Sequence, residues 1–189
     1  MDFSFIKPKD EIWLAYIGTL GLSYEIEMVI DALWLLKEKG IQNIKFIVMG
    51  EGPLKERFEH YAQTREVWAE FTGRLDYKKM AQLLKTSDIA VNPIRGGSPA
   101  EIINKVGDYA AAGLPVINTQ ESDEYRGLIE EYQAGFNCIN GDVKDVSTKL
   151  LELAENEQLR KMMGRNNRRL AEERFDRKKT YLKIVEVLV

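Results

Sequence analysis

Apolar runs of four to seven residues recur along this chain, and each is followed by a turn and then by a segment with helical spacing. This alternation is typical of βαβ units, in which successive strands pair in parallel. We predict six strands, at residues Ile12–Ile17, Ile44–Met49, Trp68–Thr72, Ile89–Asn92, Pro115–Asn118 and Phe136–Ile139. The predicted fold is therefore α/β, a Rossmann-like three-layer αβα arrangement around a six-stranded parallel sheet.

Helices are predicted where apolar residues recur every three or four positions, because such a stripe buries one helix face. The stripes are Ile26, Val29, Ile30, Leu33 and Leu36; Leu54, Phe58 and Tyr61; and Met80, Leu83 and Leu84. We expect Gly40 to end the first helix in a left-handed conformation and Asp142 to cap a later one. Helical sequence then continues to Val189, so we predict one domain over residues 1–189 with a helical tail from about residue 142.

Charge and hydropathy narrow the class of function. The 27 basic and 30 acidic side chains among 189 residues give a net charge of −3, which predicts no nucleic-acid partner. No run approaches the roughly 18 apolar residues of a spanning helix, and the first ten residues do not resemble a secretion signal. We expect a cytoplasmic protein, with peripheral association at the inner membrane face open for the full-length molecule.

Residues suited to metal chemistry are scarce. Cys138 and His60 are single representatives of their types, so one chain cannot assemble a disulfide or a cysteine/histidine metal site. We predict no metal and no cofactor, with Cys138 buried and His60 solvated. A basic cluster is predicted to be a solvated helix face rather than a phosphate or membrane patch. It comprises Arg160, Lys161, Arg165, Arg168 and Arg169.

A glycine-containing loop follows the first predicted strand. Gly18 and Gly21 stand between this strand and the first helix, where backbone N–H groups and a helix N-terminus can meet an anion. A tight turn that needs glycine only for its backbone conformation explains the loop equally well. Neither the GxGxxG fingerprint nor a GxxxxGK[ST] loop is present, which disfavours a dehydrogenase or a P-loop NTPase.

The second distinctive stretch runs from Asn92 to Val116. A glycine-rich loop leads into a short helix on which Glu101, Lys105 and Asp108 share one face. An acid there can accept hydrogen bonds from ribose hydroxyls, and the lysine can meet phosphate charge. The alternative is an ordinary surface pair of Glu101 and Lys105.

Together these segments resemble the second lobe of retaining glycosyltransferases of the GT-B fold, the large family 4 group. The matching motifs, in order, are the glycine loop, Gly50-Glu-Gly-Pro53, Phe71-Thr-Gly-Arg74 and Ala111-Ala-Gly-Leu-Pro-Val116, with Asn140-Gly-Asp142 and Met163-Gly-Arg-Asn166 resembling later signatures. The resemblance covers about Trp13 to Tyr181.

The resemblance implies roles for individual residues. It places Gly18, Thr19, Leu20 and Gly21 at the donor diphosphate, the backbone of Arg74 and Leu75 at the nucleobase, Arg95, Gly96, Gly97 and Ser98 at the donor sugar or phosphate, and Asp108 at the ribose. Glu101 and Lys105 are the candidate catalytic residues. Two departures stand out, because Ala100 occupies the position of the first acid of the family's paired-glutamate motif and Thr19 that of a usual arginine.

The implied activity is transfer of a sugar from a nucleotide sugar, a UDP-sugar, to a glycan or lipid-linked acceptor in bacterial surface-polysaccharide synthesis. We expect a further lobe before Met1 to bind the acceptor, with the final helix around Tyr181 to Leu188 packing back towards it. The lobe alone is expected to be inactive. A nucleotide-sugar-binding or regulatory module without transferase activity is the alternative, and a GT-B epimerase is less favoured.

Overall fold

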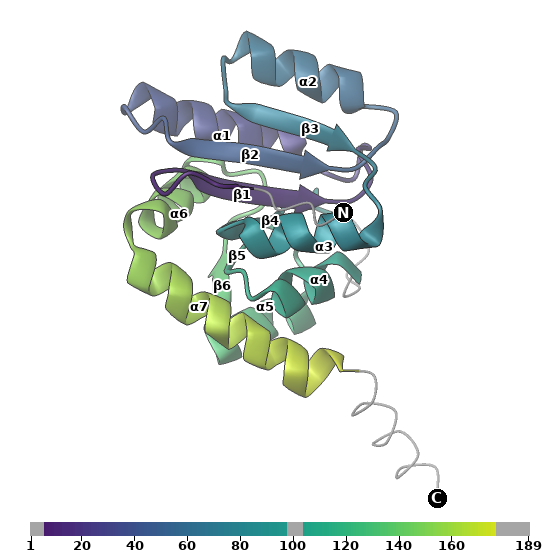
Figure 1. Cartoon of the computed structure of the whole chain (residues 1–189), viewed down its shortest axis with the longest axis vertical. Coiled ribbons are helices and arrows are strands. Elements are labelled where there is room, and N and C mark those ends of the chain that lie inside the picture. Colours follow the sequence, from purple (N-terminus) through teal and green to yellow (C-terminus); the bar gives the residue numbers. More distant parts are fainter. Residues whose placement is uncertain (1–5, 98–103, 177–189) are drawn as a thin grey trace, which may run out of the picture.

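The computed structural model describes residues 6–97 and 104–176. Its centre is a six-stranded sheet of order β3-β2-β1-β4-β5-β6, in which every pairing is parallel (Figure 1). The strands are β1 Ile12–Ile17, β2 Ile44–Met49, β3 Ala69–Gly73, β4 Ile89–Asn92, β5 Val116–Asn118 and β6 Gly135–Asn137. The predicted fold class and all six strands are confirmed, with boundaries shifted by at most two residues.

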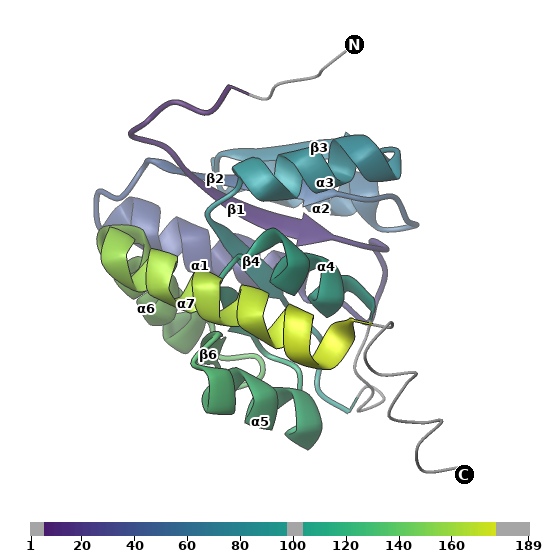
Figure 2. The same cartoon turned by 60° about the horizontal axis from the view of Figure 1, so that its bottom comes forward.

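Helices cover both faces of the sheet. They are α1 Ile26–Glu38, α2 Lys55–Thr64, α3 Tyr77–Thr86, α4 Asn104–Ala112, α5 Asp123–Tyr132, α6 Val143–Glu155 and α7 Glu157–Leu170, followed by the π-helical turn η1 Ala171–Phe175. Strand residues such as Leu14 and Phe46 pack with α1, α2 and α6, whereas Ala15 and Ile47 face α3 and α4. Because both faces are covered, the strands read as continuous apolar runs. Figure 2 shows α7 passing across α4 and α5.

Helix ends follow local sequence signals. Gly40 has φ +87° beyond α1, and the Asp142 carboxylate accepts the N–H groups of Lys144 and Asp145 at the start of α6, as predicted. Helix α5 was not among the predicted helices. Ser122 caps it by accepting the N–H of Tyr125, and its buried stripe is Tyr125, Leu128, Ile129 and Tyr132.

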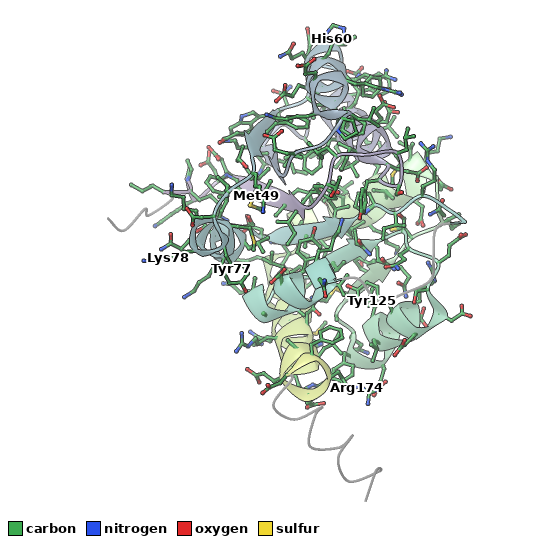
Figure 3. The ribbon with its side chains drawn as sticks, turned by 90° about the vertical axis from the view of Figure 1, so that its right-hand side faces the viewer. Met49, His60, Tyr77, Lys78, Tyr125 and Arg174 are labelled. Carbon is green, nitrogen blue, oxygen red and sulfur yellow. The ribbon has the colours of Figure 1, made fainter. Side chains whose placement is uncertain are left out.

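The expectations for single residues also hold. Cys138 is fully buried, and His60 is exposed on the outward side of α2 (Figure 3). The basic cluster lies on α7 as a solvated face, with Lys161 paired to Glu157 and Arg168 to Glu172. Arg160 donates to the Leu153 and Ala154 carbonyl groups at the end of α6. Three of the five basic residues of the cluster thus bond to groups of the protein itself.

Two glycines explain how α7 packs against α4. Gly113 ends α4 at φ +70°, and a Cβ placed on Gly164 of α7 would lie only 2.3 Å from the Gly113 carbonyl oxygen. The two backbones therefore approach too closely for any side chain at position 164. The helical Gly107 differs, because nothing lies within 4 Å of the position of its Cβ.

The same glycine-to-alanine change is thus expected to act in opposite directions in the two helices. Gly164→Ala should destabilise the fold by about 1–3 kcal/mol through overpacking, whereas Gly107→Ala should stabilise it by about 0.5–1 kcal/mol through helix propensity. Urea unfolding of both variants and the wild type measures the difference. A Gly164→Ala midpoint at or above that of the wild type would contradict the packing argument.

Candidate functional site

The strand order reverses between β1 and β4, and ligands of open parallel sheets bind beyond the carboxyl ends of the strands at such a point. The loops after β1 and β4 meet there, because Tyr24 forms an antiparallel bridge with Ile94. Figure 3 looks onto this edge, with Met49 at the end of β2 and Tyr77 at the start of α3 beside it.

The glycine loop continues the pairing of β1 with β2. The N–H of Gly18 donates to the Met49 carbonyl at 3.0 Å, and that of Leu20 donates to the Glu51 carbonyl at 2.9 Å. Contact is so close that a Cβ on Gly50 would lie 1.8 Å from the Gly18 carbonyl oxygen. Glycine is therefore required at position 50 by a neighbouring backbone.

This pairing decides which amides of the loop can meet a ligand. Gly18 and Leu20 have used their N–H groups within the fold. Within residues 6–97 and 104–176, no protein acceptor takes the N–H of Thr19 or Gly21. Of the four residues expected at the diphosphate, only Thr19 and Gly21 thus keep a backbone N–H that could donate to a ligand.

Lys105 reaches the glycine loop from α4. Its side chain is buried, and its Nζ lies 3.0 Å from the position that a Cβ on Gly18 would occupy. Nζ donates to the Tyr16 hydroxyl at 3.3 Å and lies 3.7 Å from the centroid of the Tyr24 ring. No carboxylate of the described ranges forms an ion pair with it.

Burial without a counter-charge changes the ionisation of this lysine. Removal from water disfavours the ammonium form and lowers the pKa of Lys105 to about 7. A bound anion would restore the charged form, since an opposite charge nearby raises a lysine pKa. Among the described residues, the surroundings of Lys105 thus supply aromatic rings and a hydroxyl but no anion.

A cavity of about 350 Å³ opens beside the glycine loop. It is lined by Ile17, Gly18, Thr19, Met49, Gly50, Glu51, Arg74, Leu75 and Met80. The structure thus brings Arg74 and Leu75, expected at the nucleobase, together with two of the residues expected at the diphosphate. This grouping comes from the carboxyl ends of β1, β2 and β3.

Asp108 lies further along α4 and faces a different part of the edge. Its Oδ1 accepts a hydrogen bond from the Tyr77 hydroxyl at 3.4 Å. Burial raises the pKa of the Asp108 carboxyl, and the Tyr77 hydrogen bond opposes that rise. Asp108 lines cavities of about 600 and 310 Å³, neither of which includes residues 18–21. Met80 lines both the smaller of these and the glycine-loop cavity.

The loop after β4 is fixed from other directions. The Arg95 N–H donates to the Ser23 carbonyl, and its guanidinium lies 3.8 Å from the Glu25 carboxylate. Gly96 donates its N–H to Asn140 Oδ1 at 2.9 Å, and Gly97 donates to Glu121 Oε2 at 3.3 Å. The amides of Arg95, Gly96 and Gly97, three of the residues expected at the donor sugar or phosphate, are thus bonded within the protein.

Two of the expected site residues, Ser98 and Glu101, lie outside the described residues, as does Ala100. Their placement relative to the glycine loop and Lys105 stays a prediction.

The sequence analysis gave no role to a set of buried asparagine and glutamine side chains at the ends of β4, β5 and β6. Asn92 Nδ2 donates to Asn118 Oδ1 at 2.9 Å and to Gln120 Oε1 at 3.1 Å. Asn118 Nδ2 in turn donates to Asn137 Oδ1 at 3.0 Å. The available signal was that β4, β5 and β6 each end in asparagine.

Asn140 is a second residue that was given no role. Its Nδ2 donates to the carbonyl groups of Ile94 and Thr119, while its Oδ1 accepts from Gly96. Asn140 therefore ties the loop after β4 to the turn before α6.

Two further features are absent from the described ranges. No group of three or more histidine, cysteine, aspartate or glutamate residues is placed to hold a metal ion. None of the helices in those ranges has the length and apolar character needed to cross a bilayer.

Comparison with known proteins places this geometry in a family. The model of the glycosyl transferases group 1 matches residues 1–170. An uncharacterised glycosyltransferase of Methanocaldococcus jannaschii is 28% identical over 192 residues, covering 97% of this chain and 47% of the relative. The sulfoquinovosyl transferase of Arabidopsis thaliana is 28% identical over 153 residues, covering 79% and 28%.

Among solved structures, the Anabaena protein HepE in complex with UDP superposes with a TM-score of 0.81 at 17% identity, over 95% of this chain and 49% of that one. The chain spans less than half the length of the curated relatives it matches. Since the family model covers most of the sequence and the sheet matches GT-B lobes, this chain belongs to the group 1 glycosyl transferases.

Proposed function

We propose that this chain is the donor-binding lobe of a retaining glycosyltransferase and that it binds a UDP-sugar beside the glycine loop. The observation that carries the proposal is Lys105, a buried lysine in contact with Gly18 and without a carboxylate partner among the described residues. The ammonium of Lys105 would form an ion pair with a diphosphate, and the adjacent N–H groups of Thr19 and Gly21 would donate hydrogen bonds to the same anion. The UDP in the HepE structure supports a nucleoside diphosphate as the ligand.

The residues that line the cavity indicate where the rest of the donor would lie. A uracil base would lie against the backbone of Arg74 and Leu75, which share the cavity with Gly18 and Thr19. A ribose above Met80 would connect this cavity to the one that Asp108 lines. Asp108 would then accept hydrogen bonds from the ribose hydroxyls.

Sugar transfer requires that the charge of the departing diphosphate be stabilised as it develops. Lys105 and the loop amides are preorganised for this, and we propose that they act without a metal ion. The acceptor, a glycan or a lipid-linked glycan of surface-polysaccharide synthesis, would bind to a second lobe that closes over the edge and excludes water. In the alternative, a binding module without transferase activity, the donor would bind as described while the full-length protein would transfer no sugar.

UDP-glucose binding is expected to depend on pH through Lys105. Because the free lysine has a pKa of about 7 and the bound diphosphate raises it, affinity should be constant below that pH and should fall as pH rises above it. The fall should reach up to about tenfold per pH unit. Calorimetric titration from about pH 6 to about pH 8.5 measures this, and UDP-glucose avoids the terminal phosphate of UDP, which titrates near 6.

Lys105→Met should weaken UDP-glucose binding by at least about tenfold near neutral pH, because a charge-assisted hydrogen bond is lost. It should also abolish the pH dependence. The matched control is Lys161→Met, which removes an exposed lysine of α7 that is paired with Glu157. Equal affinity of the wild type at the two ends of the pH range would refute the role of Lys105.

The contact between Asp108 and the ribose is tested by a cycle that combines a protein change with a ligand change. Wild-type protein should bind 2′,3′-dideoxy-UDP about tenfold more weakly than UDP, because a hydrogen-bonded hydroxyl is missing. In Asp108→Asn the two ligands should differ much less, since the neutral amide oxygen is a weaker acceptor than the carboxylate. Calorimetry on the four combinations gives the coupling.

Asp10→Asn is the control for this cycle, because Asp10 is an exposed carboxylate before the amino end of β1, away from the carboxyl edge. If Asp108→Asn loses the same affinity for UDP and for the dideoxy ligand, Asp108 does not touch the ribose.

A further inference from the structure

Tyr16 occupies the point where the glycine loop and Lys105 come together. It is the fifth residue of β1, its side chain is completely buried, and its hydroxyl donates to the Thr19 carbonyl oxygen at 2.7 Å. The same hydroxyl oxygen accepts from Lys105 Nζ at 3.3 Å. Burial raises the pKa of Tyr16, so the hydroxyl keeps its proton and remains a donor to the loop.

The hydrogen bond to Thr19 fixes a whole peptide plane. In a trans peptide the carbonyl and the following N–H point in opposite directions. The Thr19 carbonyl points to Tyr16, and the N–H of Leu20, in the same peptide, points to the Glu51 carbonyl. The peptide between residues 19 and 20 is thus held from both sides, which restricts how the two adjoining peptides, those with the N–H groups of Thr19 and Gly21, can turn.

Tyr24 holds the lysine from the other side. Its ring and that of Tyr16 meet edge to face, with centroids 5.8 Å apart and an interplanar angle of 67°. Lys105 Nζ lies 4.4 Å from the Tyr16 centroid and 3.7 Å from that of Tyr24, which are cation–π distances. The two rings stabilise an ammonium in a place that otherwise disfavours charge.

We propose that Tyr16 and Tyr24 are positioning residues for the donor diphosphate, in which the Tyr16 hydroxyl fixes both the glycine loop and the Lys105 ammonium while the Tyr24 ring holds the ammonium in place. The inference rests on the proposed function, because it names the residues that hold the glycine loop and Lys105 in place for the same donor. Neither tyrosine needs to touch the donor.

The groups around Lys105 that could affect its charge are few among the described residues. From β1 and its loop, Lys105 faces the hydroxyl-bearing rings of Tyr16 and Tyr24. On its own helix, Tyr109 uses its hydroxyl to accept from the Ile17 N–H and to donate to the Val91 carbonyl, and Asp108 is bonded to Tyr77. Glu25, next to Tyr24 in sequence, is paired with Arg95.

The test compares Tyr16→Phe with Tyr132→Phe in the 189-residue chain. Tyr132 is a buried tyrosine of α5 whose hydroxyl donates to Glu173 and not to the glycine loop. Each variant keeps its ring and loses one hydroxyl, but only the Tyr16 hydroxyl bonds to the loop and to the lysine. UDP-glucose affinity at about pH 6 should fall about tenfold in Tyr16→Phe and should stay unchanged in Tyr132→Phe. Tyr24→Leu, which removes a ring at a half-buried position, should weaken binding as well.

The pH profile separates positioning from a merely structural role. A hydroxyl that accepts from the ammonium favours the charged form, so its loss should move the midpoint of the Tyr16→Phe profile to lower pH. NMR titration of the Lys105 side chain without ligand should show the same shift. Thermal unfolding shows whether Tyr16→Phe is still folded. If it is not, UDP-glucose binding by Tyr24→Leu and the titration of Lys105 in that variant decide whether the tyrosines position the lysine.

Each outcome has a distinct meaning. If wild-type protein binds UDP-glucose and Tyr16→Phe has the same affinity and the same midpoint, the inference fails while the proposed function stands. An equal loss in Tyr16→Phe and Tyr132→Phe would also overturn it. If the wild type binds no UDP-glucose, the proposed function fails and the inference with it.

Discussion

The contact between two backbone turns at the carboxyl edge governs the rest of the site. The loop after β1 continues the pairing of β1 with β2, so the Gly18 carbonyl lies against Gly50 and the Leu20 backbone against Gly52. Side chains at either glycine would force the turns apart. Because the turns touch, Gly18 is held directly beside Lys105, and the alternate amides of Thr19 and Gly21 are left without a bond inside the described protein.

The position of Lys105 illustrates how such a site opposes stability. Burying an ammonium that no carboxylate of the described residues pairs with costs free energy in the unliganded chain, which its lowered pKa expresses. The aromatic rings and the Tyr16 hydroxyl offset part of that cost. Groups with such perturbed ionisation gather at functional sites, because the ligand supplies the interaction that the fold withholds.

Much of the fold could be predicted from the sequence because a parallel sheet buried on both faces leaves continuous apolar runs, as in Ile44–Met49. Helix α5 was missed because only Leu128 and Ile129 of its buried stripe are aliphatic, and the two outer positions are tyrosines. Tyr125 and Tyr132 are nonetheless almost completely buried. Asn140 was missed because its bonds to Ile94 and Gly96 join segments more than forty residues apart.

The candidate site was predictable only in part, because it too depends on contacts between residues far apart in the sequence. Lys105 could be read as a surface partner of Glu101, and its burial depends on Tyr16 and Tyr24, more than eighty residues earlier in the chain. Asp108 was placed with the glycine loop by its position in the motif. Its contact with Tyr77, and the cavities it lines, depend on how α3 packs against α4, which no local spacing encodes.

The bonds of the loop after β4 have an energetic consequence for any sugar that reaches it. Gly96 and Gly97 already donate to Asn140 and Glu121, so a sugar hydroxyl would exchange one acceptor for another instead of satisfying vacant donors. An exchange of this kind contributes little net affinity, about 1 kcal/mol or less for each bond. Recognition at this loop would therefore act through the fit between competing hydrogen-bond geometries, and the strength of binding would come from the diphosphate end of the ligand.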